Sequence, residues 1–243
     1  MMLIFCVVVM ASLSYASSGA IRDANIFVDT IFQEKMPLLV KESPRLFPYA
    51  TIEDFSFKVS KNGRTNRDLE VNMTRGEIHG LDHAVQRQGD CRAPDYYSEN
   101  VTIFCSLTLQ GLNVTFTALA QGDTLSAIRK TIWVNVAVRR TAAFFEASPY
   151  TGRDATLFTF HIGSFQLSVA YGHSLILNEG RSQKFKEEIS ARVKKELMSI
   201  FTLEYKDLLS PCCRIGQVPQ GLMVTFPKAL SKTREMVRNK ELA

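Results

Sequence analysis

The sequence predicts an α+β fold in which a long curved antiparallel sheet wraps along a long C-terminal amphipathic helix, with a second helix at the N-terminus. Apolar residues recur at three- and four-residue steps near both ends of the chain and at every second residue between them. The alternating segments are joined by short turns, which favours antiparallel pairing with one buried face. The predicted C-terminal helix, at ~42 Å, and the predicted strand around Ile103, at ~37 Å, are similar in length, as expected for a sheet that lies along the helix.

The first twenty residues, MMLIFCVVVMASLSYASSGA, predict a secretory signal peptide. They contain no charged residue, and an apolar run over Leu3–Met10 is followed by small residues, so cleavage is expected after Ala16 or after Ala20. The apolar run is well short of the roughly 20 residues that a membrane-spanning helix needs. We therefore expect a secreted, extracellular protein without a transmembrane segment, with one domain over residues 21–210 and a basic tail over residues 211–243.

Secretion determines how the cysteines and three asparagines are interpreted. Cys91 and Cys105 flank a largely polar segment and are predicted to form a disulfide. Cys212 and Cys213 are adjacent, and three states stay open for them: pairing with a partner chain, a strained vicinal bridge, or free thiols. Sequons of the type N-x-S/T begin at Asn72, Asn100 and Asn113, and predict at least one glycan.

The N-terminal helix is predicted over residues 24–34. Its apolar residues recur at helical steps, and acidic residues lie largely between them. Pro37 is expected to kink or end this helix, because proline has no backbone N–H to donate. Pro44 and Pro48 then mark a connection to the sheet.

Strands follow, because the apolar period changes to two. Asn62-Gly63 is a strong turn signal, and further turns are expected at Arg75-Gly76 and at Gln110-Gly111. The expected strands cover residues 55–59, 69–74, 81–85, 101–109, 112–118, 132–138, 142–146, 155–162 and 165–171. In this register the side chains of Asn72 and Asn113 point away from the apolar side and into solvent, which is where a glycan would have to lie.

The long C-terminal helix is predicted over residues 181–209, where Pro211 is expected to stop it. One side carries a stripe of apolar residues, and lysine, arginine and glutamate cover the other side. The chain contains no internal repeat and no low-complexity linker, so the order helix, sheet, helix fits one domain.

The sequence lacks the motifs of common catalytic sites, including G-x-S-x-G, S-x-x-K, the P-loop, G-x-G-x-x-G and C-x-x-C. We therefore expect no enzyme activity and no cofactor. His79 and His83 are four residues apart, which on a helix would place two metal ligands on one face. On the strand expected there they lie about 13 Å apart, so no metal site is predicted.

The charge distribution disfavours nucleic acid as a partner. The net charge of +5 is mild, and basic and acidic residues are mixed over most of the chain. The tail after Pro211 is the exception. We expect a solvated tail, and contact with an anionic lipid or a glycosaminoglycan is the alternative. The basic residues of the tail are Arg214, Lys228, Lys232, Arg234, Arg238 and Lys240.

Apolar residues on the inward side of the strands and of the long helix are the candidate ligand-binding residues. A long sheet curled over one helix leaves a groove that side chains need not fill, and small hydrophobic ligands bind in apolar pockets. The alternative is an ordinary packed core. The predicted lining consists of Phe55, Phe57, Val71, Ile103, Leu107, Val114, Phe116, Ile132, Val134, Ile189, Val193, Leu197 and Phe201.

Four segments resemble those of the mite group 7 allergens and their tick salivary relatives. They are RDANIFVDTIFQEKMP, FSFKV, RGEIHGLDHAVQRQGDCRAPDYYSENVTIFCSLTLQG and KFKEEISARVKKEL, and the resemblance covers residues 21–210. That family belongs to the tubular lipid-binding superfamily, which includes bactericidal/permeability-increasing protein. The resemblance implies a curved sheet around a long helix, an elongated apolar cavity, binding of lipids or other amphipathic ligands, and no catalysis.

Two functions follow as hypotheses. The first is a secreted carrier or scavenger of lipids or other hydrophobic small molecules, which would lie between the sheet and the long helix. The second is a secreted protein-interaction module, a salivary modulator of host proteins that uses the fold as a scaffold. A lipocalin is disfavoured, because the sole tryptophan, Trp133, lies in mid-chain rather than in a G-x-W motif near the start.

Overall fold

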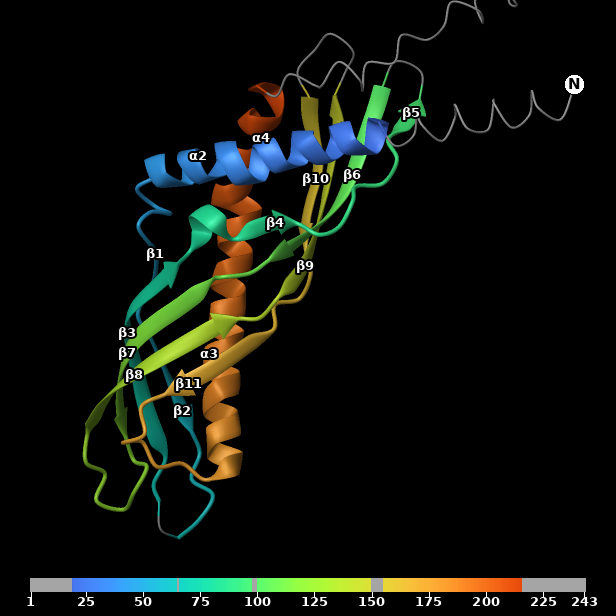
Figure 1. Cartoon of the computed structure of the whole chain (residues 1–243). Coiled ribbons are helices and arrows are strands. Elements are labelled where there is room, and N and C mark those ends of the chain that lie inside the picture. Colours follow the sequence, from blue (N-terminus) through green and yellow to red (C-terminus); the bar gives the residue numbers. More distant parts are fainter. Residues whose placement is uncertain (1–18, 65, 98–99, 150–154, 216–243) are drawn as a thin grey trace, which may run out of the picture.

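The predicted α+β architecture is confirmed in a computed structural model, which describes residues 19–64, 66–97, 100–149 and 155–215 (Figure 1). The signal-peptide cleavage after Ala16 and the part of the basic tail beyond residue 215 lie outside the described residues. No helix in the described part of the chain has the length and apolar character that crossing a bilayer would require.

The N-terminal helix is longer than expected and has three segments. Residues 19–29 are helical, a π-helix η1 covers Thr30–Lys35, and α2 covers Met36–Glu42. The expectation that Pro37 kinks or ends the helix is wrong as to the end, which comes at Glu42. Met36, directly before Pro37, keeps helical backbone angles (φ −60°, ψ −41°), and the π-helical segment Thr30–Lys35 precedes it, so the helix runs through the proline.

The strands form two antiparallel sheets. Sheet A has the order β1-β3-β7-β8-β11, with β2 also paired to β3, and sheet B has the order β10-β9-β6-β4, with β5 also paired to β6. The strands of sheet A are β1 (Ala50–Ile52), β2 (Phe55–Val59), β3 (Leu69–His79), β7 (Asn113–Gln121), β8 (Lys130–Val138) and β11 (Leu167–Tyr171). Those of sheet B are β4 (Val85–Arg87), β5 (Asp95–Tyr97), β6 (Asn100–Leu109), β9 (Thr141–Pro149) and β10 (Ala155–Ile162).

Two expected turns have other roles. Gln110-Gly111 does not join a hairpin, because β6 pairs with β9 and β4 while β7 pairs with β3 and β8. The chain instead passes from one sheet to the other there. At Arg75-Gly76 the strand continues through a bulge, with the register shifting between Thr74 and Glu77. A Cβ on Gly76 would approach both Ile52 and Phe116 to 2.7 Å, so close packing requires glycine at this point.

The strand expected over residues 81–85 is also different. A short 3-10 helix, η2, covers Leu81–His83, and only the three residues of β4 follow as strand. Gly80, at φ 86°, turns the chain out of β3 into η2 and lies against Gly111, where a Cβ would be 2.7 Å from the carbonyl oxygen.

The C-terminal helix is continuous over both sheets, as Figure 1 shows. It consists of α3 (Glu179–Ile200), a π-helix η3 (Phe201–Tyr205) and α4 (Lys206–Ile215). The expectation that Pro211 stops the helix is wrong. Leu209, Cys212 and Cys213 are buried beyond the π-segment, and α4 packs on β10, α2 and η1, so tertiary packing holds the helix past the proline.

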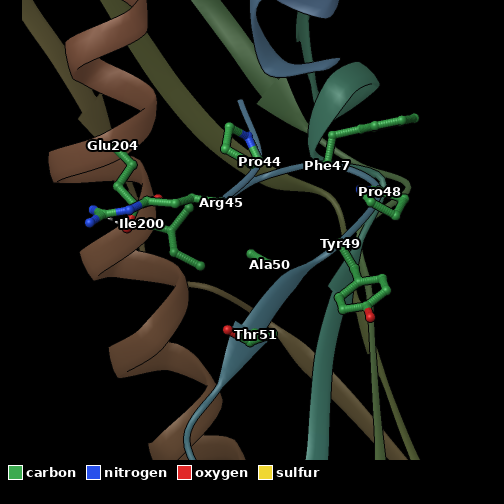
Figure 2. A pocket seen from close by; sticks show the side chains of 9 residues that line it. All are labelled: Pro44, Arg45, Phe47, Pro48, Tyr49, Ala50, Thr51, Ile200 and Glu204. Carbon is green, nitrogen blue, oxygen red and sulfur yellow. Dashed lines mark ion pairs between the residues drawn. The ribbon is translucent and has the colours of Figure 1, made fainter. Parts of the chain in front are cut away.

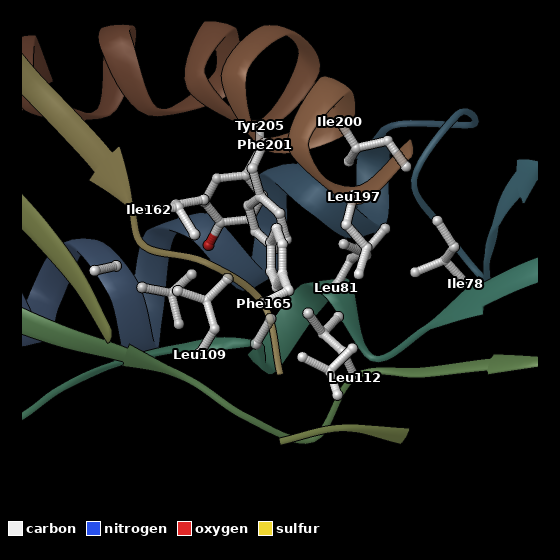
Figure 3. Packing of buried hydrophobic residues seen from close by; sticks show 14 of the residues in the cluster. Ile78, Leu81, Leu109, Leu112, Ile162, Phe165, Leu197, Ile200, Phe201 and Tyr205 are labelled. Atoms are coloured by element: carbon white, nitrogen blue, oxygen red, sulfur yellow. The ribbon is translucent and has the colours of Figure 1, made fainter. Parts of the chain in front are cut away.

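One apolar core runs through the molecule. Its middle part lies at the junction of the two sheets and includes Leu109 of β6, Phe165 between β10 and β11, and Phe201 of η3, as Figure 3 shows; the rings of Phe165 and Phe201 are 6.2 Å apart. The predicted disulfide between Cys91 and Cys105 is present. Cys212 and Cys213 are not bridged to each other, and both side chains are buried.

Candidate ligand-binding site

The space between sheet A and α3 is the part of the fold that matches the predicted site. α3 approaches sheet A at its two edge strands, β2 and β11, so the helix closes a curved sheet over its central strands. Five aromatic residues lie in this space and form what we call the aromatic seam. Its members are Phe55 and Phe57 of β2, Phe116 of β7, Tyr171 of β11 and Phe185 of α3.

The rings of the seam are in contact with one another from edge to edge of the sheet. The centroids are 5.8 Å apart for Phe55 and Phe116, 5.7 Å for Phe57 and Phe185, and 4.9 Å for Tyr171 and Phe185. These are ordinary separations for interacting aromatic pairs. The seam therefore connects β2, α3 and β11 through a continuous aromatic surface.

Part of the seam is accessible from outside. Phe116 and Phe185 are buried, whereas Phe55, Phe57 and Tyr171 are only partly buried against the core. Partial exposure of large rings at the seam between a helix and a sheet edge costs hydrophobic free energy. A hydrophobic molecule that covered these rings would recover this hydrophobic free energy.

Charged groups lie at the rim of the seam. The Arg192 guanidinium is 5.6 Å from the centroid of the Phe55 ring, and it pairs with Glu196 at 3.0 Å. Arg192 Nε is buried and has no hydrogen-bond partner among the described residues. On the other side, Lys186 Nζ is 6.0 Å from the Tyr171 ring, whose hydroxyl shares a hydrogen bond with Ser182 at 2.9 Å.

A buried polar cluster lies next to the seam, at the N-terminal end of α3. Arg181 is only 1% exposed, and its guanidinium donates to the carbonyl oxygens of Arg67 (2.8 Å) and Gly122 (3.2 Å). Burial lowers the pKa of Arg181, against the opposing effect of the nearby Asp123 carboxylate. The cluster joins three loops to the helix.

The predicted lining residues fall into separate groups. Those on sheet A and on α3 face one another across the core, whereas Ile103 and Leu107 belong to β6 of sheet B, beyond the junction. Apart from Phe55 and Phe57, all of them are buried. The buried sheet A and helix residues are Val71, Val114, Phe116, Ile132, Val134, Ile189, Val193, Leu197 and Phe201.

A second aromatic cluster fills the core at the sheet B end. Phe32 of η1 packs edge-on against Phe145 at 5.4 Å, and Phe201 packs against Tyr205 at 5.0 Å. Burial raises the pKa of Tyr205 far above its ordinary value and that of the neighbouring Cys213 thiol to about 12. This thiol is therefore protonated at neutral pH, and its low thiolate content makes it unreactive.

Sequence reasoning missed an open groove of about 510 Å³ beside β1, shown in Figure 2. It lies between the segment 44–51 and the helix at Ile200 and Glu204. Arg45 and Glu204 face each other across it at 3.9 Å, while Figure 2 shows Phe47 and Tyr49 pointing away. Its walls include charged side chains and backbone, so it suits a polar ligand better than a lipid chain. Pro44 and Pro48 were the only sequence signal, and they indicated a connection alone.

The two histidines with metal-like spacing lie in different elements and have different acidic partners. His79 ends β3 and pairs with Glu77 at 3.1 Å, and His83 lies in η2 and pairs with Asp82 at 3.2 Å. Asn72 is exposed and Asn113 is partly exposed, whereas the side chain of Asn100 lies outside the described residues.

Comparison with known proteins identifies one close relative. The chain is 37% identical to the salivary anticoagulant protein P23 of Ixodes scapularis over 208 residues, which covers 85% of this chain and 93% of P23. The predicted resemblance to tick salivary proteins is thereby confirmed. No protein-family model matches this chain.

Two solved structures are similar to the fold at low identity. A lipopolysaccharide binding protein is 12% identical with a TM-score of 0.41, over 80% of this chain and 40% of that one. Takeout 1 of Epiphyas postvittana is 14% identical with a TM-score of 0.33, over 84% of this chain and 93% of that one.

Proposed function

The chain belongs to the family of the tick salivary anticoagulant protein P23, and from that premise we propose that it is a secreted, non-enzymatic protein that binds a lipid or another hydrophobic small molecule between sheet A and α3. The observation that carries the proposal is the partial exposure of Phe55, Phe57 and Tyr171 within an otherwise buried aromatic seam. The apolar part of the ligand lies against these rings, and its affinity comes from burying their exposed surface, at about 25 cal/mol per Å² of apolar area less the cost of immobilising the ligand.

The rim of the seam favours an amphipathic ligand with an acidic head group. Arg192 lies over Phe55, and its buried Nε is free to donate among the described residues. A carboxylate or phosphate next to Phe55 would accept from this nitrogen, and a buried donor that gains a charged partner contributes more than a neutral hydrogen bond does.

Native mass spectrometry of the secreted protein, run beside lipid extraction, tests the proposal. We expect a stoichiometric lipid-sized adduct that denaturation releases. Phe57→Ala should weaken uptake of a fluorescent fatty acid by about tenfold, because most of a phenylalanine's burial energy is lost. Phe144→Ala is the matched control, since Phe144 is 38% exposed on β9 and stacks on Phe104 away from the seam.

The variant Arg192→Gln distinguishes the contribution of the ligand's acidic head group from that of its acyl chain. It should weaken binding of a fatty acid and leave binding of the fatty alcohol of equal length unchanged. If the Phe57→Ala protein is folded and takes up the fluorescent fatty acid as well as the unsubstituted protein does, the aromatic seam is not the binding site. If the native mass spectrum shows only the protein without an adduct, and the unsubstituted protein takes up no fatty acid, the proposal of a lipid-binding protein is contradicted.

A second function, inhibition of blood clotting by contact with a host protein, is favoured by the identity to P23. It uses the fold as a scaffold and does not need the seam. The purified protein should then prolong the clotting time of plasma after lipid extraction, and Phe57→Ala should prolong it equally. Prolongation that depends on loaded lipid would instead tie the clotting effect to the seam.

A further inference from the structure

Three loops meet at the end of the molecule where α3 begins, and we call this end the tip. They are residues 60–68 between β2 and β3, residues 122–129 between β7 and β8, and residues 172–178 between β11 and α3. Figure 1 shows the tip at the bottom of the view, at the opposite end from α2 and α4.

Hydrogen bonds fix these loops to one another. The buried Asp123 carboxylate pairs with Lys130 and accepts from the backbone N–H of Ile176 at 3.3 Å. Lys130 Nζ also donates to the Ser174 carbonyl at 2.8 Å, and Arg181 bonds to the carbonyls of loops 60–68 and 122–129. The tip is therefore a preorganised surface, joined by charge-assisted bonds across all three loops.

Large aliphatic side chains project from this surface into solvent. Leu125 is 53% exposed, Ile128 is 63% exposed and Ile176 is 68% exposed. The Asp123 bonds hold Ile176 beside the loop that carries the other two. Isolated exposed apolar residues are normal on a protein surface, but three on adjoining, mutually bonded loops form a patch that indicates an interaction.

A tryptophan lies at the margin of the patch. Trp133 of β8 is 54% exposed, and its carbonyl accepts from the backbone N–H of Gly172 at 3.0 Å. A Cβ on Gly172 would be 3.5 Å from Trp133 Nε1, so the indole lies beside loop 172–178. Aromatic rings with one polar edge are enriched where an apolar phase meets water.

The exposed charges around the patch are mostly positive. Lys61, Arg64, Arg67 and Arg129 are exposed on these loops, whereas Asp123 is buried in an ion pair. The exposed acids are Asp68 and, at the start of α3, Glu179. An excess of arginine and lysine around aliphatic side chains complements a surface that is negatively charged outside and apolar below.

We propose that the tip inserts Leu125, Ile128 and Ile176 into anionic phospholipid membranes. The aliphatic side chains enter the boundary between head groups and acyl chains, Trp133 lies at the level of the head groups, and Lys61, Arg64 and Arg129 contact lipid phosphates. This inference uses exposed residues outside the aromatic seam, so it does not rest on the proposed ligand.

The test uses the full-length secreted protein and vesicles of phosphatidylserine mixed with phosphatidylcholine. Trp133 is the sole tryptophan of the chain, so its emission reports directly on the tip. We expect a blue shift and co-sedimentation with the mixed vesicles, and weak binding to pure phosphatidylcholine. Binding should decrease as salt is raised, because screening weakens contacts between exposed charges.

The variant Leu125→Ser/Ile128→Ser/Ile176→Ser should bind the mixed vesicles at least about tenfold more weakly, since each buried aliphatic side chain contributes to insertion. Leu38→Ser/Leu203→Ser is the matched control, because these residues are 62% and 60% exposed away from the tip. Arg64→Glu/Arg129→Glu, which removes no apolar group, should also weaken binding and reduce its salt dependence.

Circular dichroism checks that each variant is folded. Equal vesicle binding by the triple-serine variant and the unsubstituted protein would overturn the proposal and assign membrane contact to the basic tail, which all variants retain. Equal binding to neutral and anionic vesicles would overturn the role of the basic residues. Absence of binding to any vesicle would overturn insertion and leave a protein partner for the patch.

Discussion

At the scale of single residues, Asp123 is the charged group on which most local structure depends. Its side chain is fully buried, it pairs with Lys130, and it accepts from the Ile176 backbone. Asp123→Ala should lower the free energy of unfolding by about 3–5 kcal/mol, because removing one partner leaves the Lys130 ammonium without its counter-charge. Chemical unfolding in urea measures the change.

Glu70→Ala is the matched control for Asp123→Ala. Glu70 pairs with Lys58 at 2.7 Å, but both side chains are more than half exposed, so this change should cost at most about 1 kcal/mol. If both variants lost the same stability, burial would not be what gives the Asp123 pair its importance.

The buried thiols and phenol of the C-terminal helix give stability a pH dependence. Burial raises the pKa of Tyr205, and it raises that of Cys213 to about 12, so the folded state keeps protons that the unfolded state releases. Stability is therefore fully present below the ordinary thiol pKa and should fall as pH rises from about 9 towards 12.

Urea unfolding at pH 8 and at pH 10.5, without a reductant so that the Cys91–Cys105 disulfide stays intact, measures this effect. Each group contributes up to about 1.4 kcal/mol per pH unit while only its unfolded form titrates. Cys213→Ala should make the loss between the two pH values smaller. An equal loss in this variant would place the titrating group elsewhere.

Residue identities alone predict which side chains are apolar and inward, but not what surrounds a charged one. Parity and helical period correctly indicated the buried positions Val71, Val114 and Ile189. Arg181 lies on the same helix as the predicted stripe and is equally buried, yet its acceptors are carbonyls 59 and 114 residues away in the sequence. No local pattern contains that information.

At the scale of elements, the sequence predicts the type of each long segment better than its end. Pro37, expected to kink or end its helix, and Pro211, expected to stop its helix, both lie within helical segments that continue past them. Gln110-Gly111 has the composition of a hairpin turn, but it links two sheets, because strand pairing depends on distant partners. Local turn chemistry cannot distinguish these two topologies.

The Cys91–Cys105 disulfide closes the loop that anchors the N-terminal helical segment, residues 19–29. Its loop is closed over a separation of 14 residues, and the Cys91 N–H donates to Asn25 of the N-terminal helix at 2.8 Å. Cys91→Ala/Cys105→Ala should cost about 3 kcal/mol by the loop-entropy estimate. It should also accelerate amide exchange within residues 19–29, because their anchor is loosened.

Asn25→Ala is the control for the disulfide variant, since it removes the side-chain bonds to Cys91 and Asp90 but keeps the disulfide. It should cost about 1 kcal/mol and accelerate exchange in the same helix to a smaller extent. Unchanged exchange in both variants would show that the 2.7 Å ion pair between Asp29 and Arg87 and the apolar packing of the helix anchor it without the disulfide.

At the scale of the whole molecule, one helix connects the proposed ligand site to the far end of the core. α3 covers the aromatic seam of sheet A, η3 lies over the junction, and α4 packs on β10, α2 and η1 at the sheet B end. The seam, the tip and the buried thiols are thus attached to a single continuous element, Glu179–Ile215. The sequence predicted one helix over residues 181–209, and it missed only the last turn, which continues past Pro211 to Ile215.

This continuity predicts that both ends of the molecule unfold together. Trp133 reports on sheet A, and the thiols of Cys212 and Cys213 report on the opposite end, where burial protects them from reagents. Tryptophan emission, thiol reactivity and far-UV circular dichroism should therefore give one common midpoint in urea. Thiols that react at a lower urea concentration than the tryptophan transition would mean that α4 separates first and that the packing around Phe201 and Tyr205 does not couple the two sheets.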